Sequence, residues 1–310
     1  MTQSHFTTRD LVAALAVMVI WGLNFVAMKF ALHDFTPFQL GAARFAAAVL
    51  PLVLLIKPPK LHWKWVVLFG LFQGLGQFGF LFMALKVGMT AALASVLMQT
   101  QVFFTAVFGF VLLHERASRA LQAGLLLAAL GLACFAMNYI APHTDSARTT
   151  TALGFALNLG AAAMWGGSNI VARKAHQSTA HLDAVAFVVW SSLVPIAPFI
   201  VLTLLFDDGA TRWLSLQSWR AVPLSSWLAI AYLGWVATIL AYGLWTSLLK
   251  RHAANHVAPF GLGVPVVGLA AGMLVLGETV TAWQWAGIAL VVAALACVMF
   301  GGRYLDKKPL

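Results

Sequence analysis

The sequence contains very little charge. Asp, Glu, Lys and Arg together make up 9% of its 310 residues, whereas about 25% of a soluble domain is charged. Hydrophobic residues account for 62% of the chain, against roughly 45–50% in a soluble domain. This composition excludes an ordinary soluble domain, because most side chains must face lipid or other apolar helices.

Acidic residues are the scarcer charged type. The chain has 9 Asp and Glu against 19 Lys and Arg, which gives a formal net charge of +10. The basic residues lie almost wholly between apolar runs, where they orient helices in a membrane. We therefore expect membrane lipid around the chain and no nucleic-acid partner.

No Asp or Glu falls in the middle of an apolar run. The histidines offer no substitute, since those nearest the runs lie at run ends: His114, His176, His181 and His256. Proton-driven antiporters usually need a titratable group inside the membrane. The sequence therefore offers no obvious proton relay, and efflux of cationic drugs on a central carboxylate is not expected.

Cysteine is nearly absent as well. Cys134 and Cys297 both lie inside apolar runs and lack the spacing of metal ligands. We therefore predict no metal site and no cofactor. A membrane-embedded enzyme would need convergent nucleophiles, a metal triad or an acid–base pair within the bilayer, and the sequence shows none of these.

Long apolar runs dominate what is present. A membrane-spanning helix needs about 20 apolar residues, so we predict an all-α integral membrane protein with ten transmembrane helices. They cover residues 11–32, 38–56, 64–86, 91–113, 119–140, 151–173, 183–206, 225–249, 256–277 and 281–301. The polar residues 1–10 precede a run long enough to span, so no cleavable signal peptide is expected.

The loops on alternate sides of these runs differ in Lys and Arg content. One side carries Arg9, Lys57, Lys60, Lys64, Arg116, Arg119, Arg173, Lys174, Lys250, Arg251, Arg303, Lys307 and Lys308, and the other carries Lys29, Lys86, Arg148, Arg212 and Arg220. The side richer in basic residues is normally cytoplasmic. Both termini are therefore predicted to lie in the cytoplasm.

The second half of the chain repeats the first. A spacing of Leu, Glu and Gly occurs as Leu113, Glu115 and Gly124 and returns as Leu276, Glu278 and Gly287. We predict two five-helix units, residues 10–141 and 150–303. Because each holds an odd number of spans, the second unit is inverted relative to the first. In transporters built this way, the substrate site lies between the repeats near the middle of the membrane.

Polar side chains occur near the middles of several predicted helices, where they are costly unless they find partners or line a wet cavity. The candidates for substrate binding are Trp21, Asn24, Gln73, Gln77, Gln99, Gln101, Trp165, Ser168, Asn169, Thr238, Tyr242 and Trp245. For a single buried amide, a hydrogen bond that joins two helices, worth roughly 0.6 kcal/mol, explains the residue as well as substrate binding does. Their presence in both halves at similar depth favours a shared cavity, although the aromatic stripe alone also fits ordinary packing.

Two further features allow two interpretations each. Gly263 and Pro265 lie in a glycine-rich run, where proline frees backbone carbonyls, so this segment is either a packed, fixed kink or a gate for the cavity. Arg44 lies inside the second run but off its midpoint. It either snorkels outward or pairs with Asp34, or it attracts a substrate carboxylate, and its depth favours the structural role.

Several motifs resemble a known family. Residues 19–25 read VIWGLNF, Pro37 and Arg44 follow, and a Glu–Gly pair with the same spacing occurs at 115/124 and 278/287. These features resemble the EamA family of the drug/metabolite transporter superfamily. Residues 77–82, 94–104 and 257–269 are similar to the members that export O-acetylserine and cysteine. One departure is that the second half has WGGSN at 165–169, one residue longer than WGLN at 21–24.

The resemblance implies the fold of that superfamily, in which two inverted five-helix repeats enclose a cavity that opens alternately to each side. It implies a multi-pass protein of the bacterial inner membrane that exports amino acids and related metabolites, such as cysteine or O-acetylserine. Aromatic amino acids or other small metabolites are the alternative substrates. A non-transporting membrane scaffold is the alternative of another class, but it leaves the polar residues at midspan unexplained. The fifth and tenth runs, rich in Ala, Gly and Leu, fit a homodimer contact or lipid contact equally well.

Overall fold

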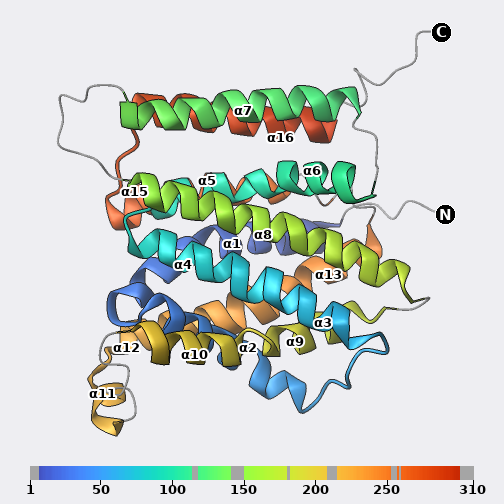
Figure 1. Ribbon diagram of the computed structural model, residues 1–310, viewed down its shortest axis with the longest axis vertical. Helices are drawn as coiled ribbons and strands as arrows, with labels where there is room; N and C mark the ends of the chain where they lie inside the picture. The colour runs from blue at the N-terminus through green and yellow to red at the C-terminus, as the bar shows by residue number, and fades with distance from the viewer. Residues whose placement is uncertain are drawn as a thin grey trace.

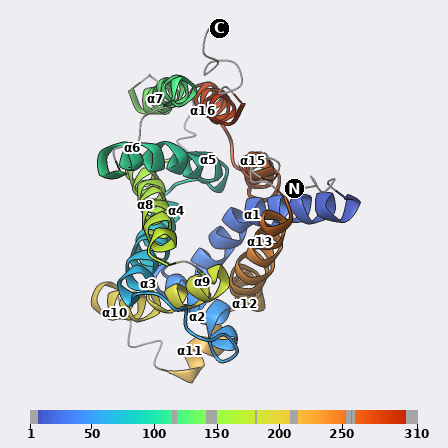
Figure 2. The same cartoon turned by 90° about the vertical axis from the view of Figure 1, so that its right-hand side faces the viewer.

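The computed structural model describes residues 7–113, 118–140, 150–179, 182–207, 215–252, 257 and 260–300. Every regular element within these ranges is a helix. Most helices run side by side across the view of Figure 1, and the view along them in Figure 2 shows that they surround a common centre. Several residues used above lie outside the described part: His114, Glu115, Arg116, Arg148, His181, Arg212, His256, Arg303, Lys307 and Lys308.

The first half of the chain forms five long helical segments, two of which change their winding. The elements are α1 (Thr8–Asp34), α2 (Pro37–Val53), α3 (Trp63–Phe69), the π-helical η1 (Gly70–Gln77), α4 (Phe78–Lys86), α5 (Ala91–Leu97), the 3₁₀-helical η2 (Met98–Thr100), α6 (Gln101–Leu113) and α7 (Arg119–Ile140). The elements α3, η1 and α4 form one continuous helix, and so do α5, η2 and α6.

The second half follows a similar order. Its elements are α8 (Ala152–Gln177), α9 (Ala184–Leu193), α10 (Ile196–Phe206), the short α11 (Leu216–Ala221), α12 (Leu224–Ala231), the π-helical η4 (Tyr232–Leu240), α13 (Ala241–Arg251), α15 (Gly263–Leu276) and α16 (Ala282–Phe300). The elements α12, η4 and α13 form one continuous helix.

Polar caps mark where several of these helices begin. The hydroxyls of Thr7, Thr36, Thr90 and Thr151 each accept a backbone N–H from the first turn of the helix that follows. Asp183 does the same for two N–H groups of α9. Such caps satisfy N–H groups that have no partner inside the helix, and they fix the helix ends near the predicted boundaries.

Among the described residues, seven helices are long and apolar enough to cross a membrane by these properties alone. They are Thr8–Asp34, Trp63–Lys86, Ala91–Leu112, Arg119–Met137, Ala184–Phe206, Leu224–Trp245 and Ala282–Phe300. The other three predicted spans correspond to α2 with 17 residues, α15 with 14 residues and α8, which carries several polar residues. The chain is thus an all-helical, multi-pass membrane protein with seven candidate spans, while ten spans and the unit boundaries 10–141 and 150–303 stay predictions.

The two halves of the chain are interleaved. Helix α1 of the first half packs against α12, α13 and α15 of the second, and α8 packs against η1, α4 and α6. Helices α7 and α16 pack against each other and lie at one edge of the molecule, at the top of Figures 1 and 2. The predicted homodimer contact through these two helices stays a prediction.

The helices α1, α5 and α15 approach one another closely at two glycines. A Cβ atom on Gly22 would overlap Val267, and a Cβ atom on Gly268 would overlap the side chain of Ser95. Ser95 also donates a hydrogen bond of 3.3 Å to the carbonyl oxygen of Pro265. Small residues permit this kind of backbone approach in membrane proteins.

The two π-helical segments occupy corresponding places in the two halves. Both η1 and η4 lie in the middle of the third long helix of their half, between α3 and α4 and between α12 and α13. Each packs against α2 or α8, near the centre of the molecule. Wide turns of this kind are rare and often mark functional sites.

Candidate functional site

A cavity of about 420 Å³ lies where the two halves meet. It is lined by Trp21, Asn24, Phe25, Arg44, Phe45, Phe69, Gln73, Gln77, Phe78, Leu81, Ser95, Met98, Gln99, Gln101, Trp165, Asn169, Ala172, Val188, Ser192, Ala237, Thr238, Tyr242, Trp245, Gly261 and Val264. Both π-helical segments and the 3₁₀ turn η2 contribute to this lining. The irregular winding of the helices is therefore concentrated around the cavity.

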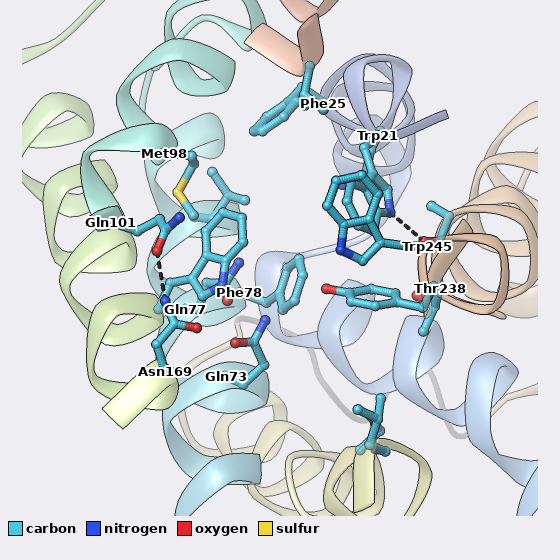
Figure 3. A pocket seen from close by; sticks show the side chains of 18 of the residues that line it. Trp21, Phe25, Gln73, Gln77, Phe78, Met98, Gln101, Asn169, Thr238 and Trp245 are labelled. Atoms are coloured by element: carbon cyan, nitrogen blue, oxygen red, sulfur yellow. Dashed lines mark hydrogen bonds between the residues drawn. The ribbon is translucent and has the colours of Figure 1, made fainter. Parts of the chain in front are cut away.

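The cavity has two walls of different chemistry, which Figure 3 shows. Gln77, Gln101 and Asn169 lie with Met98 on one wall, and Trp21, Trp245 and Thr238 lie on the other. Phe78 lies between the two walls. A ligand in this space would meet the amides of Gln77, Gln101 and Asn169 on the first wall and the indoles of Trp21 and Trp245 on the second, while Trp165 and Asn24 add an indole from α8 and an amide from α1.

Hydrogen bonds between helices hold the amide wall in place. Asn169 of α8 donates from Nδ2 to Gln101 Oε1 at 2.8 Å and to Thr105 Oγ1 at 3.0 Å. Ser168 donates to Gln73 Oε1 at 2.6 Å and to the carbonyl oxygen of Trp165 at 2.7 Å. These bonds join α8 to α6 and η1, so they orient lining amides that would otherwise rotate freely.

The aromatic wall is held by its rings and by the wide turn of η4. Trp21 packs at tilted angles on Tyr242 and Trp245, with ring centroids 5.1 and 5.3 Å apart. Its indole Nε1 donates to the carbonyl oxygen of Ala237 at 3.1 Å. Thr238 donates to the carbonyl oxygen of Leu233, five residues earlier, at 2.8 Å. Side chains thus bond to carbonyl oxygens of η4 and fix the wall.

Three nearly buried lining residues carry polar atoms that lack a hydrogen-bond partner in the described part of the chain. They are Asn24 at Oδ1, Gln77 at Oε1, and Arg44 at Nε and Nη1. Their exposed fractions are 9%, 4% and 3%. Buried polar groups are nearly always paired, so these atoms point to a missing partner in or beside the cavity.

Arg44 is the charged residue of the cavity lining. Its Cζ atom lies over the ring of Phe78, 4.0 Å from the centroid. Neither structural role that its sequence position suggested is found, because Arg44 is buried and Asp34 contacts His33 and Ser226 instead. The depth of Arg44 in its apolar run favoured a structural role for this residue. That expectation did not take into account that α2 places Arg44 in the cavity lining.

Of the residues predicted to bind substrate, all but Ser168 line the cavity. Ser168 is fully buried beside Gln73. Gly263 and Pro265 are not among the lining residues, whereas their neighbours Gly261 and Val264 are. Pro265 lies in the first turn of α15 and not at the middle of a helix, where it removes no internal hydrogen bond. The helical winding is interrupted at Leu262, three residues before Pro265, and both the fixed kink and the gating role of the pair stay predictions.

Sequence reasoning missed the apolar lining and the part played by two helices. Phe45 and Arg44 come from α2, and Val188 and Ser192 come from α9. Phenylalanine, valine and alanine occur throughout these helices, so no pattern marks the few that face the cavity. For Arg44 the signal was present, since a charge inside an apolar run is a candidate for function.

The two ends of the bundle are closed by different contacts. The N-terminal face, where α1 begins and α13 ends, holds an ion pair of 2.5 Å between Asp10 and Arg251. On the opposite face, Glu278 accepts the backbone N–H groups of Ala91 and Ala92, both at 2.8 Å. These contacts join the first half to the second at each end.

Further bonds close the opposite face. Lys29 donates to the carbonyl oxygen of Leu85, and Lys86 donates to that of Leu32, both at 3.0 Å. Thr36 bonds to Asp207 on the same face. The lining residues Phe69, Ala172 and Val188 lie instead in the helix halves nearest the N-terminal face. Leu81 and Ser95, which also line the cavity, lie in the helix halves nearest the opposite face, so the cavity occupies the middle of the bundle.

No group of three or more His, Cys, Asp or Glu side chains in the described ranges could hold a metal ion. The lining offers amide and hydroxyl groups, indole rings and one guanidinium. This arrangement can bind and release a small polar molecule through hydrogen bonds and ring contacts.

Comparison with known proteins places these features in a family. A family model described as the EamA-like transporter family matches the chain twice, at residues 9–137 and 152–300. A "Probable amino-acid metabolite efflux pump" of Salmonella typhimurium strain LT2 is 39% identical over 95% of this chain and 96% of its own length. A protein of the same description from Escherichia coli strain K12 is 38% identical over 96% of each chain.

A solved crystal structure supports the fold alone. It shares 20% identity with this chain, covers 97% of it and 100% of its own length, and superposes with a TM-score of 0.60. The two family matches together cover most of the sequence, and each spans one half of the interleaved bundle. The chain belongs to the EamA-like transporter family, and it is a transporter and not an enzyme.

Proposed function

We propose that the protein exports amino acids and related metabolites, such as cysteine or O-acetylserine, across the bacterial inner membrane by alternating access. The observation that carries the proposal is the cavity between the two halves, lined by amides, indoles and one guanidinium. Its volume of about 420 Å³ falls in the range of small-molecule sites, roughly 300–1,000 Å³. The bacterial relatives described as amino-acid metabolite efflux pumps support the same substrate class.

The proposal includes ten membrane-spanning helices in two inverted repeats, with both termini in the cytoplasm. The distribution of Lys and Arg supports this orientation. The matching positions of η1 and η4 support the repeat. In this orientation the N-terminal face of the bundle is the cytoplasmic one.

The chemistry of the two walls suits a small zwitterion. Amide groups donate and accept hydrogen bonds, so they serve both a carboxylate and an ammonium group. The faces of Trp21 and Trp245 attract an ammonium group through cation–π contact, worth about 0.5–2 kcal/mol. Bulky aromatic amino acids are the second candidate substrates, since the indole wall would also stack on their rings.

Alternating access requires that the contacts at the two faces form in turn. In the structure the bonds of Glu278 to α5 and the pair of Asp10 with Arg251 are both formed, one at each face. Rocking of the two halves would break one set and leave the other. The glycine-rich, π-helical η1 gives the bundle a place to bend.

Counterflow in proteoliposomes tests the proposal. Purified protein is reconstituted, and uptake of labelled cysteine, O-acetylserine and tryptophan is measured with unlabelled amino acid inside. We expect uptake above that of empty liposomes, and a tenfold or larger decrease on Asn24→Leu or Gln77→Leu, since each removes about 1.5 kcal/mol of bonding to a charged group. Counterflow of tryptophan alone would favour the aromatic alternative.

The control is Gln122→Leu, which replaces an exposed amide on α7, outside the cavity. This variant should transport like the wild type. Absence of counterflow with every amino acid would favour a non-transporting scaffold and contradict the proposal.

A further inference from the structure

We propose that Arg44 binds the carboxylate of the substrate, and that the side-chain oxygens of Asn24 and Gln77 bind its ammonium group. The cavity would then select free α-amino acids over derivatives in which either charge is removed. This inference rests on the proposed function, because it assigns recognition roles within the same cavity. It also assigns Arg44 to substrate binding, whereas its position in the sequence favoured a structural role.

The contacts of Arg44 leave its hydrogen-bonding edge free. Phe78 covers one face of the guanidinium, with 4.0 Å between Cζ and the ring centroid. Carboxylates bind guanidinium in its plane, through parallel N–H groups. A ring on the face and a carboxylate at the edge are therefore compatible, and the ring holds the group in position for the second contact.

The described part of the chain supplies no anion for the guanidinium of Arg44. Nε and Nη1 of Arg44 have no hydrogen-bond partner in the described part of the chain, although the side chain is only 3% exposed. A buried charge without a partner is strongly destabilising. Asp34, the nearest acid along the sequence, bonds to Ser226 at 2.5 Å and contacts His33. A carboxylate brought by the substrate would complete the site.

The free oxygens complement this cation. Asn24 Oδ1 and Gln77 Oε1 are buried, lie on cavity-lining side chains and lack partners among the described residues. Gln77 and Phe78, whose ring covers the guanidinium of Arg44, both line the cavity. An α-amino acid carries its donor and acceptor groups on one carbon atom. Free donors on Arg44 and free acceptors on the two amides match that pair of groups.

The pattern also disfavours other ligand classes. A cationic substrate would face the positive charge of Arg44 without an Asp or Glu in the cavity lining. A purely anionic substrate would use Arg44 but would leave the oxygens of Asn24 and Gln77 facing like charge. A neutral zwitterion satisfies all three side chains at once.

Competition for counterflow by matched derivatives tests the inference. The probes are L-cysteine, L-cysteinamide and N-acetyl-L-cysteine under reducing conditions, and the corresponding acid, amide and N-acetyl forms of L-phenylalanine. Each amide should compete about tenfold to a hundredfold less well than its parent acid, because it loses a charge-assisted bond. In Arg44→Gln, the acid should fall to the level of the amide, while competition by the amide changes less than about twofold.

Three variants separate the roles. Arg44→Lys keeps the charge without the planar fork, so it should retain part of the preference for the acid, and it decides the matter if Arg44→Gln does not fold. Asn24→Leu and Gln77→Leu should weaken competition by the parent acid but leave the N-acetyl form unchanged. Arg220→Gln removes an equal charge from the exposed α11, outside the cavity, and should behave as the wild type.

Different results would contradict the proposed function and the binding roles assigned to Arg44, Asn24 and Gln77. If wild-type protein shows no counterflow and no probe competes, the proposed function is wrong. If amino acids are transported but amides compete as well as acids, only the role of Arg44 is overturned. The same holds if folded Arg44→Gln or Arg44→Lys does not show the expected competition by acid and amide probes. Equal loss of acid and N-acetyl competition in the Asn24 and Gln77 variants overturns the ammonium assignment.

Discussion

Asp10 at the start of α1 forms an ion pair with Arg251 at the end of α13, with 2.5 Å between Oδ1 and Nη1. The other carboxylate oxygen lies 3.0 Å from Nε2 of His252 and accepts the backbone N–H of Thr7 at 3.1 Å. Helix α1 belongs to the first half of the chain and α13 to the second. This buried carboxylate therefore fastens the two halves together at the N-terminal face.

Asp10→Asn should lower the melting temperature, because it leaves the basic side chains of Arg251 and His252 without their anion. Thermal unfolding of the detergent-solubilised protein measures this change. Arg251→Gln should cost less, since 45% of the Arg251 side chain is exposed and exposed ion pairs contribute about 0–1 kcal/mol. An unchanged melting temperature in Asp10→Asn would refute this account.

Glu278→Gln should weaken closure of the opposite face. The carboxylate accepts two backbone N–H groups at the start of α5, at 2.8 Å each, and negative charge is favourable at a helix N-terminus. An amide offers one oxygen and no charge, so we expect a loss of about 1–2 kcal/mol. Thr90→Ala, which removes longer bonds of 3.3 Å from Leu93 and 3.5 Å from Thr150, provides the comparison. A larger loss in Thr90→Ala would contradict the assignment.

Asn169→Leu should disturb transport more than stability. The substitution removes two bonds to Gln101 and Thr105, which at roughly 0.6 kcal/mol each amounts to about 1 kcal/mol of folding free energy. It also releases the amide of Gln101 in the cavity wall. We expect kcat/KM for counterflow to fall at least about tenfold. Thr105→Val breaks the bond from Asn169 and the bonds that Thr105 donates to Gln101, but it leaves Asn169 bonded to Gln101 and should have a smaller effect.

Two glycine substitutions should change stability in opposite directions. A Cβ on Gly268 would overlap Ser95, whereas Gly243 in α13 has no atom within 4 Å of the place where its Cβ would lie. Gly268→Ala should therefore destabilise the protein by about 1–3 kcal/mol through overpacking. Gly243→Ala should stabilise it by up to about 1 kcal/mol, because alanine restricts the unfolded chain. Melting temperatures of the two variants, measured side by side, decide this.

The sequence was enough to predict an all-helical membrane protein and its family. Apolar runs separated by polar segments predicted the helices, because a helix satisfies its own backbone hydrogen bonds inside lipid. The amides Gln73, Gln77 and Asn169 were found because polar groups at midspan are rare and costly. Their shared location at one cavity follows from the packing of α8 against α6 and η1, which no local pattern specifies.

The features of the site that the sequence did not predict depend on how each helix is wound and on its rotation about its own axis. Ser168 and Asn169 are neighbours, yet Ser168 is turned into the packed contact with Gln73 while Asn169 lines the cavity. Pro265 was expected at midspan but lies at the start of α15. Small errors in rotation or in a helix boundary are invisible in hydropathy, and they decide which side chain meets a ligand.

The π-helical η4 has a consequence for how the aromatic wall tolerates insertions and deletions. A wide turn holds one residue more than an α-helical turn, so removing a single residue between 232 and 240 would restore ordinary winding. Every residue after it would keep its orientation around the helix axis, whereas a deletion in a regular helix rotates the following residues by about 100°. Tyr242 and Trp245 would still face Trp21 after such a deletion, but loss of the wide turn without a deletion would swing both away from it. The register of this wall therefore depends on the wide turn of η4 accommodating its surplus residue, whichever ligand the cavity receives.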